Sequence, residues 1–163
     1  MPILGNHEKQ IRPRSNQPPE EKVYDVEATA FRTFYALPGD EWKWRFDIPE
    51  FNVTFLALDL NHITDYGTTW QACHNFRQGS DQLVWYREQL QKKTSQYVIT
   101  LQNEQNQRMR SQADGEWGRL FQQPTHVLTG YGYFSERAEL NGITYYNSSL
   151  KAGDIYPDEY SKG

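Results

Sequence analysis

The sequence predicts an α/β fold, a mixed β-sheet with flanking helices. Short apolar runs at 53–60, 97–101 and 126–129 have the length of buried strands, and an amphipathic stretch at 80–92 separates the first two. Near the carboxyl end, Asn141-Gly142 lies between two further short runs, which is typical of a β-hairpin. With 163 residues, the chain is expected to form one domain.

The first third of the chain is predicted to contain one strand, one loop and one helix. An apolar run at 2–4 leads into Gly5-Asn6-His7-Glu8, which suits a buried strand opening into a loop. Residues 9–22 are polar and contain three prolines, so we expect a surface loop. Between Val23 and Leu37 apolar residues recur at three- and four-residue steps, which predicts a helix ending at Pro38-Gly39. The apolar stripe of this helix would be Val23, Val26, Ala30, Phe34 and Leu37.

The middle of the chain predicts a strand pair and a helix. Three aromatic residues at 42, 44 and 46 alternate with charged residues, which indicates a half-buried strand, and 49–52 forms the turn to the run at 53–60. Residues 61–79 have no clear period and should form a long irregular loop. Ser80 suits a helix N-cap, and Leu83, Tyr86 and Leu90 give a helical stripe that ends at about Lys92.

The last third is predicted to add strands around a polar segment. Residues 97–101 and 126–129 are expected as strands, whereas 102–123 is rich in Gln and contains Gly115 and Gly118, which favours a loop with one helical piece. A tight turn at 130–133 precedes two strands, 135–140 and 143–148. We expect the domain to cover 1–153, followed by a loosely held tail at 154–163.

Composition narrows the function classes. Seventeen basic and 21 acidic residues, spread without long runs, give a net charge of −4 and argue against nucleic acid or an anionic membrane surface as partners. Cys73 is the only cysteine, so the chain has neither an intrachain disulfide nor a thiolate metal cage. The start has no signal-peptide pattern, and no stretch approaches about 18 apolar residues. The sequence therefore predicts a soluble protein and leaves its compartment unknown.

Several stretches, in the family's order along the chain, resemble the carboxyl-terminal half of calcineurin-like metallophosphoesterases of the purple-acid-phosphatase kind. Gly5-Asn6-His7-Glu8 is similar to the family's G-N-H-E block, 31–38 to a helix end, 42–61 to its paired strands and 82–90 to the helix that follows. The segment 127–133, then Glu136-Arg137 and Asn141-Gly142, lies where such enzymes carry G-H-x-H, an acidic-Arg pair and an Asn-Gly hairpin. The resemblance implies a partial metallophosphoesterase-like fold.

Most of the implied metal chemistry is missing from the chain. Such enzymes use two metal ions to polarise phosphoryl oxygens and to generate hydroxide near neutral pH. The resemblance implies ligands from upstream D-x-H and G-D-x-x-D blocks, which the chain lacks, from Asn6, and from three downstream histidines. Here 100–103 reads Thr-Leu-Gln-Asn, and Tyr131 and Tyr133 replace the histidines of G-H-x-H. Asn6 is thus the one metal-ligand position retained, and His7 the one acid-base candidate.

We therefore expect a catalytically degenerate domain that serves as a structural or binding component of a larger assembly, with no metal cofactor. The alternative is a fragment or split subunit of an active phosphoesterase, in which Asn6 binds a pair of Fe, Zn or Mn ions, His7 is catalytic, and Tyr131 and Tyr133 join the site. A third possibility, a carbohydrate or peptide binder, depends on the aromatic composition alone. Read without the resemblance, Asn6-His7 is a structural turn, and Tyr131 and Tyr133 are either a binding lip or the aromatic filling of a vacated metal cavity. Two histidines, His62 and His74, are expected on a loop surface, and His126 in the core.

The resemblance also implies a partner. The chain begins at the G-N-H-E strand, whose neighbouring strands would belong to an absent first half. We expect 2–4 to be an exposed strand edge, with Phe55, Ala57 and the helix stripe partly uncovered. A protein partner or a homo-oligomer would then cover this surface.

Overall fold

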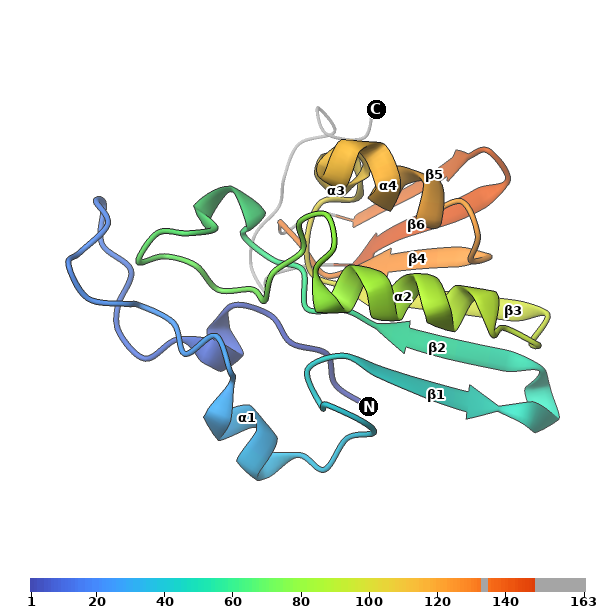
Figure 1. The fold of residues 1–163 in the computed structure, drawn as a ribbon, viewed down its shortest axis with the longest axis horizontal. Coiled ribbons are helices and arrows are strands. Elements are labelled where there is room, and N and C mark those ends of the chain that lie inside the picture. The colour runs from blue at the N-terminus through green and yellow to red at the C-terminus, as the bar shows by residue number, and fades with distance from the viewer. Residues whose placement is uncertain (133–134, 149–163) are drawn as a thin grey trace.

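A computed structural model describes residues 1–132 and 135–148, which form a six-stranded mixed sheet with flanking helices (Figure 1). The predicted α/β fold class is confirmed. Tyr133 and the tail predicted at 154–163 lie outside the described residues. No helix in the described ranges has the length and hydropathy needed to cross a bilayer. The elements in chain order are α1 Thr29–Phe34, β1 Trp44–Ile48, β2 Val53–Ala57, α2 Asp81–Gln91, β3 Tyr97–Gln102, α3 Asn106–Arg110, α4 Gln112–Leu120, β4 His126–Thr129, β5 Ser135–Leu140 and β6 Ile143–Ser148, with 3₁₀ turns at His7–Lys9, Pro49–Phe51 and Ile63–Asp65.

Two antiparallel hairpins flank a parallel centre in the strand order β1-β2-β3-β4-β6-β5. The turn between β5 and β6 places Asn141 at φ 53° and Gly142 at φ 78°, the left-handed pair that a two-residue hairpin loop requires. Strands β2, β3, β4 and β6 run parallel. Figure 1 shows their carboxyl ends pointing toward the side where the amino-terminal segment and the loop at 61–79 gather.

One face of the sheet carries the main hydrophobic core. Buried side chains of β2, β3 and β4 meet the stripe of α2 that the sequence predicted, together with the aromatic residues of α4 and the segment after it. Two hydrogen bonds satisfy polar groups inside this core: Tyr86 Oη lies 2.7 Å from Thr100 Oγ1, and Trp117 Nε1 donates to Phe76 O at 2.8 Å. The core cluster includes Leu56, Val98 and Val127 from the sheet, Leu83, Tyr86 and Leu90 from α2, and Trp117 and Phe121.

The opposite face is apolar but largely uncovered. The strand register places one row of side chains, Phe46, Phe55, Ile99 and His126, beside a second row, Trp44, Ala57, Leu101, Leu128 and Tyr146. Trp44 and Ala57 are buried, so the expectation that Ala57 is uncovered is wrong, whereas the other members are half-buried or exposed. Phe46 retains 42% of its accessible surface and Tyr97, on the same face, 43%. We call Phe46, Phe55, Ile99, Leu101, Leu128 and Tyr146 the open face; none of them belongs to a cluster of buried described residues.

The amino-terminal segment departs from the predictions. Residues 2–4 form no strand; Leu4 is buried instead in a small separate cluster with Ala28 and Phe31. The helix predicted for 23–37 is limited to α1, because Val23 pairs with distant chain: its N–H donates to Thr69 O at 2.9 Å, and its carbonyl accepts from Ile11 N at 2.9 Å. Long-range backbone pairing thus outweighs the helical spacing. The stripe does not form one helix face, because Val23 and Val26 lie outside α1. Ala30 is exposed and Phe34 keeps 80% of its surface, in agreement with the expectation that these residues are uncovered.

Two helices, α3 and α4, replace the single helical piece predicted for 102–123. Gly118 does not break α4 but lets it approach α3, because a Cβ at this position would lie 2.7 Å from the backbone oxygen of Arg110. Gly115 ends a run of three left-handed residues that kinks the start of α4, with Ala113 and Asp114 before it. Neither glycine excludes a helix, as the sequence had suggested: Gly118 allows close packing of α4 on α3, and Gly115 belongs to the kink.

Candidate functional site

Three segments of the resemblance meet at the carboxyl ends of the parallel strands. Asn103, directly after β3, lies between two glycine loops: a Cβ on Gly5 would be 2.7 Å from Asn103 Nδ2, and one on Gly130 would be 3.6 Å from Asn103 Oδ1. The segments 5–8, 100–103 and 130–131 are therefore neighbours in space. Carboxyl ends of parallel strands are the usual place for ligand sites in open α/β sheets, so we take this edge as the candidate site.

His62 lies in this edge among positive charges. Its ring packs edge-to-face against Tyr131, with ring centroids 6.0 Å apart, and its Nδ1 lies 3.4 Å from Arg14 Nη1. Burial, the Arg14 guanidinium and the charges of His7 and Arg108 lower the pKa of His62, while Asp65 opposes them. Arg108 reaches Tyr131 Oη at 3.5 Å. His62 is thus half-buried inside a polar cluster, and the prediction of a loop-surface residue is wrong.

Asn6 and His7 belong to a 3₁₀ turn. Asn6 is the N-cap at φ −76° and ψ −32°, and its side chain makes no capping hydrogen bond. The turn is closed by backbone bonds, with Lys9 N donating to Asn6 O at 3.2 Å. His7 is exposed, and its Nδ1 lies 3.1 Å from Gln10 Oε1. This local bonding agrees with a structural turn.

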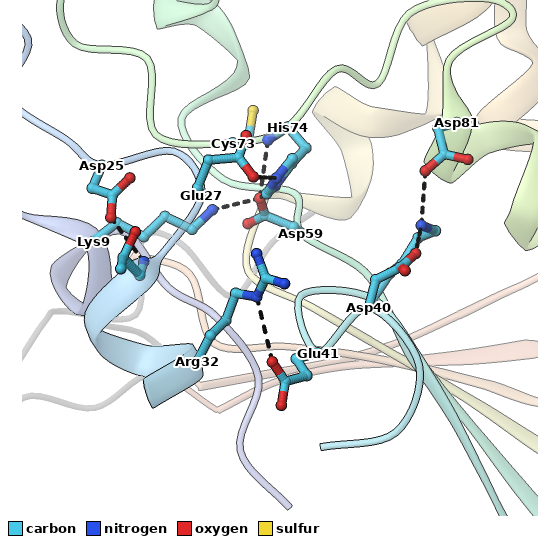
Figure 2. A network of polar contacts seen from close by, with 12 residues as sticks. Lys9, Asp25, Glu27, Arg32, Asp40, Glu41, Asp59, Cys73, His74 and Asp81 are labelled. Atoms are coloured by element: carbon cyan, nitrogen blue, oxygen red, sulfur yellow. Dashed lines mark hydrogen bonds and ion pairs between the residues drawn. The ribbon is translucent and has the colours of Figure 1, made fainter. Parts of the chain in front are cut away.

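The turn is fastened to the sheet through a buried ion pair that the sequence reading missed. Lys9, the last residue of the turn, is buried; its ammonium binds the carboxylate of Asp59 and donates to Ala72 O at 2.7 Å. Asp59 also receives a hydrogen bond from the backbone N–H of His74 at 2.9 Å, and His74 Nδ1 lies 2.6 Å from the same oxygen. Figure 2 shows Lys9, Asp59 and His74 converging from three separate segments.

The opposite charges of Lys9 and Asp59 compensate each other inside the protein. Burial by itself raises the pKa of Asp59, but the Lys9 ammonium and His74 outweigh it, so the pKa lies below its usual value of 3.8. The other face of His74 stacks on Trp42, with centroids 3.8 Å apart and rings 9° from parallel. His74 is therefore a structural partner and not a loop-surface residue. The sequence does contain a sign of the Asp59 role, because this carboxylate interrupts the apolar run at 53–60. No feature of the polar segment at 9–22 distinguishes Lys9.

Cys73 does not offer a nucleophile at this site. The thiol is buried, and burial with the nearby Asp59 carboxylate raises its pKa to about 12. The nucleophilic and metal-binding form of cysteine is the thiolate, which is a negligible fraction at neutral pH under these conditions. Cys73 is therefore part of the packing beside the Lys9 and Asp59 pair.

The donors at the carboxyl edge do not fit a pair of divalent metal ions. Asn6 and Asn103 offer neutral amide oxygens and Tyr131 a phenol oxygen, and none of these is a carboxylate, an imidazole or a thiolate. His7 adds one imidazole, already bonded to Gln10. Within residues 1–132 and 135–148, no group of three or more His, Cys, Asp or Glu side chains is placed to hold a metal ion.

Tyr131 also forms part of the rim of a cavity of about 710 Å³. The cavity lies on the core-side face of the sheet, between α3 and the strands β4, β6 and β5. Its floor includes Thr129, Asn147 and Glu136, which the register places next to one another. Of the two predicted lip residues, Tyr131 thus borders a cavity, and Tyr133 lies outside the described residues.

His126 differs from its prediction too. Its half-buried side chain lies on the same side of the sheet as the open face rather than in the core. The ring stacks on that of Tyr146, with ring centroids 6.2 Å apart.

Comparison with known proteins supplies no relative: no protein-family model matches the chain, and no curated protein does. The resemblance to metallophosphoesterases therefore depends on the motifs in the sequence alone.

Proposed function

We propose that this chain is a catalytically degenerate metallophosphoesterase-like domain that works as a structural component of a larger assembly. The observation that carries the proposal is the open face, an apolar surface on one side of a sheet whose other side carries the main hydrophobic core. A sheet with two apolar faces is normally covered on both. The open face is then the surface to which a protein partner, or a second copy of the chain, binds.

The size of the open face suits such an interface. Six strands about 4.8 Å apart span roughly 24 Å, and side chains of five of these strands contribute to the face. Full burial of one large apolar side chain stabilises by about 1.5–3 kcal/mol relative to exposure. Several half-covered residues on one surface therefore supply the free energy of a stable association, and contiguous apolar patches of this kind typically mark interfaces.

The sheet edges support a partner on the face rather than at an edge. Edge strand β1 carries the ion pair of Arg45 and Asp47, and edge strand β5 carries the ion pair of Arg137 and Glu139. Charged side chains on edge strands discourage pairing with another chain. The sequence predicted an exposed strand edge at 2–4, but these residues are not part of the sheet, whose edge strands are β1 and β5.

Light scattering on the purified chain at micromolar concentration tests the proposal. We expect a mass above that of the monomer, or a partner that copurifies in fixed proportion. The double variant Phe55→Lys with Leu128→Lys should be monomeric, because it places two charges on the open face. Phe51→Lys is the matched control, since Phe51 is 72% exposed in the turn before β2 and does not belong to the open face. A monomeric wild-type chain that unfolds cooperatively would refute the proposal.

A second candidate is a split subunit of an active phosphoesterase. The meeting of Gly5, Asn103 and Gly130 at one edge favours it, because the retained Asn6 and His7 then stand beside the loop of Tyr131. Phosphomonoester hydrolysis with added Zn, Fe or Mn separates the two candidates. The first predicts background rates and less than stoichiometric metal by elemental analysis, because the edge lacks a Lewis acid and a hydroxide source. Turnover that His7→Ala abolishes and Lys22→Ala preserves would establish the second candidate.

A further inference from the structure

A row of polar side chains crosses the core-side face of the sheet. Neighbouring residues in the register are Gln102 on β3, Thr129 on β4, Asn147 on β6 and Glu136 on β5. One step back along the strands, the row consists of Thr100, Val127, Tyr145 and Ala138, so the polarity begins abruptly at the carboxyl end. Polar groups placed in a core cost free energy unless they are hydrogen-bonded.

Two amides in this row are only half satisfied. Asn147 is 3% exposed; its Nδ2 donates to Tyr131 O at 2.6 Å, but its Oδ1 has no partner among the described residues. Gln102 is fully buried, and its Nε2 donates to Asn106 Oδ1 at 2.6 Å while its Oε1 is likewise unpaired within the described part of the chain. Asn147 lines the cavity of about 710 Å³, but its Oδ1 has almost no accessible surface, so the unpaired acceptor lies within the cavity wall.

Opposite charges line the same cavity. Glu136 belongs to the floor, and Arg110 belongs to the helix α3 wall, where its guanidinium lies 5.8 Å from the centroid of the Tyr145 ring. Neither Arg110 nor Glu136 is in an ion pair with any residue in 1–132 or 135–148. Toward the β5–β6 turn, the lining offers apolar surface from Ala138, Leu140 and the ring of Tyr145. The lining also includes polar side chains, among them Gln105, Asn106, Gln107 and Glu139, of which Glu139 pairs with Arg137.

We propose that this cavity binds a free α-amino acid with an apolar side chain. Its ammonium pairs with Glu136, its carboxylate pairs with Arg110, and its side chain lies against Ala138, Leu140 and Tyr145. The volume is in the range of small-molecule sites, and the cavity combines charged groups with an apolar wall, as a ligand with two charges and an apolar side chain requires. This site is on the opposite face of the sheet from the open face, so it is independent of the proposed assembly.

Calorimetric titration with three probes tests the site in the full chain. L-leucine carries both charges, leucinamide lacks the carboxylate, and N-acetyl-leucine lacks the ammonium. We expect L-leucine to bind, and each of the other probes to bind at least about tenfold more weakly, because each loses one charge-assisted contact. Absence of L-leucine binding at millimolar concentration, or equal affinity for all three probes, would overturn the proposal.

Two variants assign the contacts. Arg110→Gln should remove the preference for leucine over leucinamide and keep the preference over N-acetyl-leucine, whereas Glu136→Gln should do the reverse. The matched control is Glu50→Gln, an exposed carboxylate in the turn before β2. The side chains of Arg110 and Glu136 are partly exposed, and circular dichroism of each variant verifies that the fold is retained. If both variants keep the wild-type preferences, the ligand does not occupy this cavity.

Discussion

Lys9 is the residue whose burial has the largest consequence for the amino-terminal segment. It is separated by 50 positions from Asp59, yet the two side chains form an ion pair with no solvent exposure on either. Attraction between buried charges offsets their desolvation only when both partners are present. The pair therefore selects one position for the turn that carries Asn6 and His7.

Lys9→Met should strongly destabilise the protein. The substitution keeps an unbranched side chain of similar length but leaves the Asp59 carboxylate buried without its ammonium, so we expect a loss of about 3 kcal/mol in the free energy of unfolding. Urea unfolding followed by fluorescence measures it. Lys22→Met, at an exposed position, should change the value by less than about 0.5 kcal/mol. Equal stabilities of the two variants would show that the ion pair contributes nothing.

The same pair predicts an acid-sensitive contribution to stability. The pKa of Asp59 in the folded protein lies below its usual value of 3.8, so the ionised carboxylate stabilises the fold above that pH. This contribution is lost as the pH falls through the folded-state pKa. The stability difference between wild type and Asp59→Asn should therefore be constant near neutral pH and shrink below about pH 4. A difference that grows on acidification would contradict the prediction.

At the scale of elements, Gly118 decides how closely α3 and α4 approach. Replacing a helical glycine by alanine normally stabilises a helix by about 1 kcal/mol. Here the new Cβ would lie 2.7 Å from the Arg110 carbonyl oxygen, which is backbone and cannot rotate away. We expect Gly118→Ala to lower the free energy of unfolding by about 1–3 kcal/mol, the usual cost of overpacking. An exposed helix substitution, Gln91→Ala, should be neutral or stabilising in the same urea experiment.

The elements that the sequence predicted well are those that local patterns specify. The Asn141-Gly142 turn needs only two residues that accept left-handed backbone, and its hairpin has the predicted bounds, 135–140 and 143–148. The stripe of Leu83, Tyr86 and Leu90 is likewise a local signal, and all three are buried in α2.

The misplaced elements depend on contacts that no local pattern contains. Val23 has helical spacing to Val26 and Ala30, but its backbone bonds to Thr69 and Ile11 make it extended. For the candidate site, sequence motifs identified Asn6, His7 and Tyr131, whose segments do meet, while Lys9 and Asn103 acquire their roles only through the fold. Partners that are 50 or more positions apart cannot be recognised from one sequence without an alignment.

At the scale of the whole molecule, the two faces of the sheet should respond oppositely to the same change. Val98 and Ile99 are neighbours on β3, but Val98 is buried in the core and Ile99 is on the open face. In the monomeric Phe55→Lys and Leu128→Lys background, Val98→Thr should cost about 2 kcal/mol because it buries a hydroxyl. Ile99→Thr should cost less than Val98→Thr, because the Ile99 side chain keeps part of its surface exposed in the monomer. Thermal or urea unfolding measures both, and equal costs would mean that the open face is covered within a single chain.

Cys73 gives the molecule a built-in chemical reporter. Cys73 is buried, and its neighbour Ala72 accepts a hydrogen bond from Lys9, so we expect detachment of the segment carrying Lys9 to make the thiol more accessible. With one cysteine in the chain, the rate of labelling by an excess of a disulfide reagent then measures the free energy of that partial opening separately from global unfolding. We expect labelling in native buffer to be much faster in Lys9→Met than in Lys22→Met. The opening of the amino-terminal segment could thus be followed while the spectroscopic signals of the sheet stay unchanged.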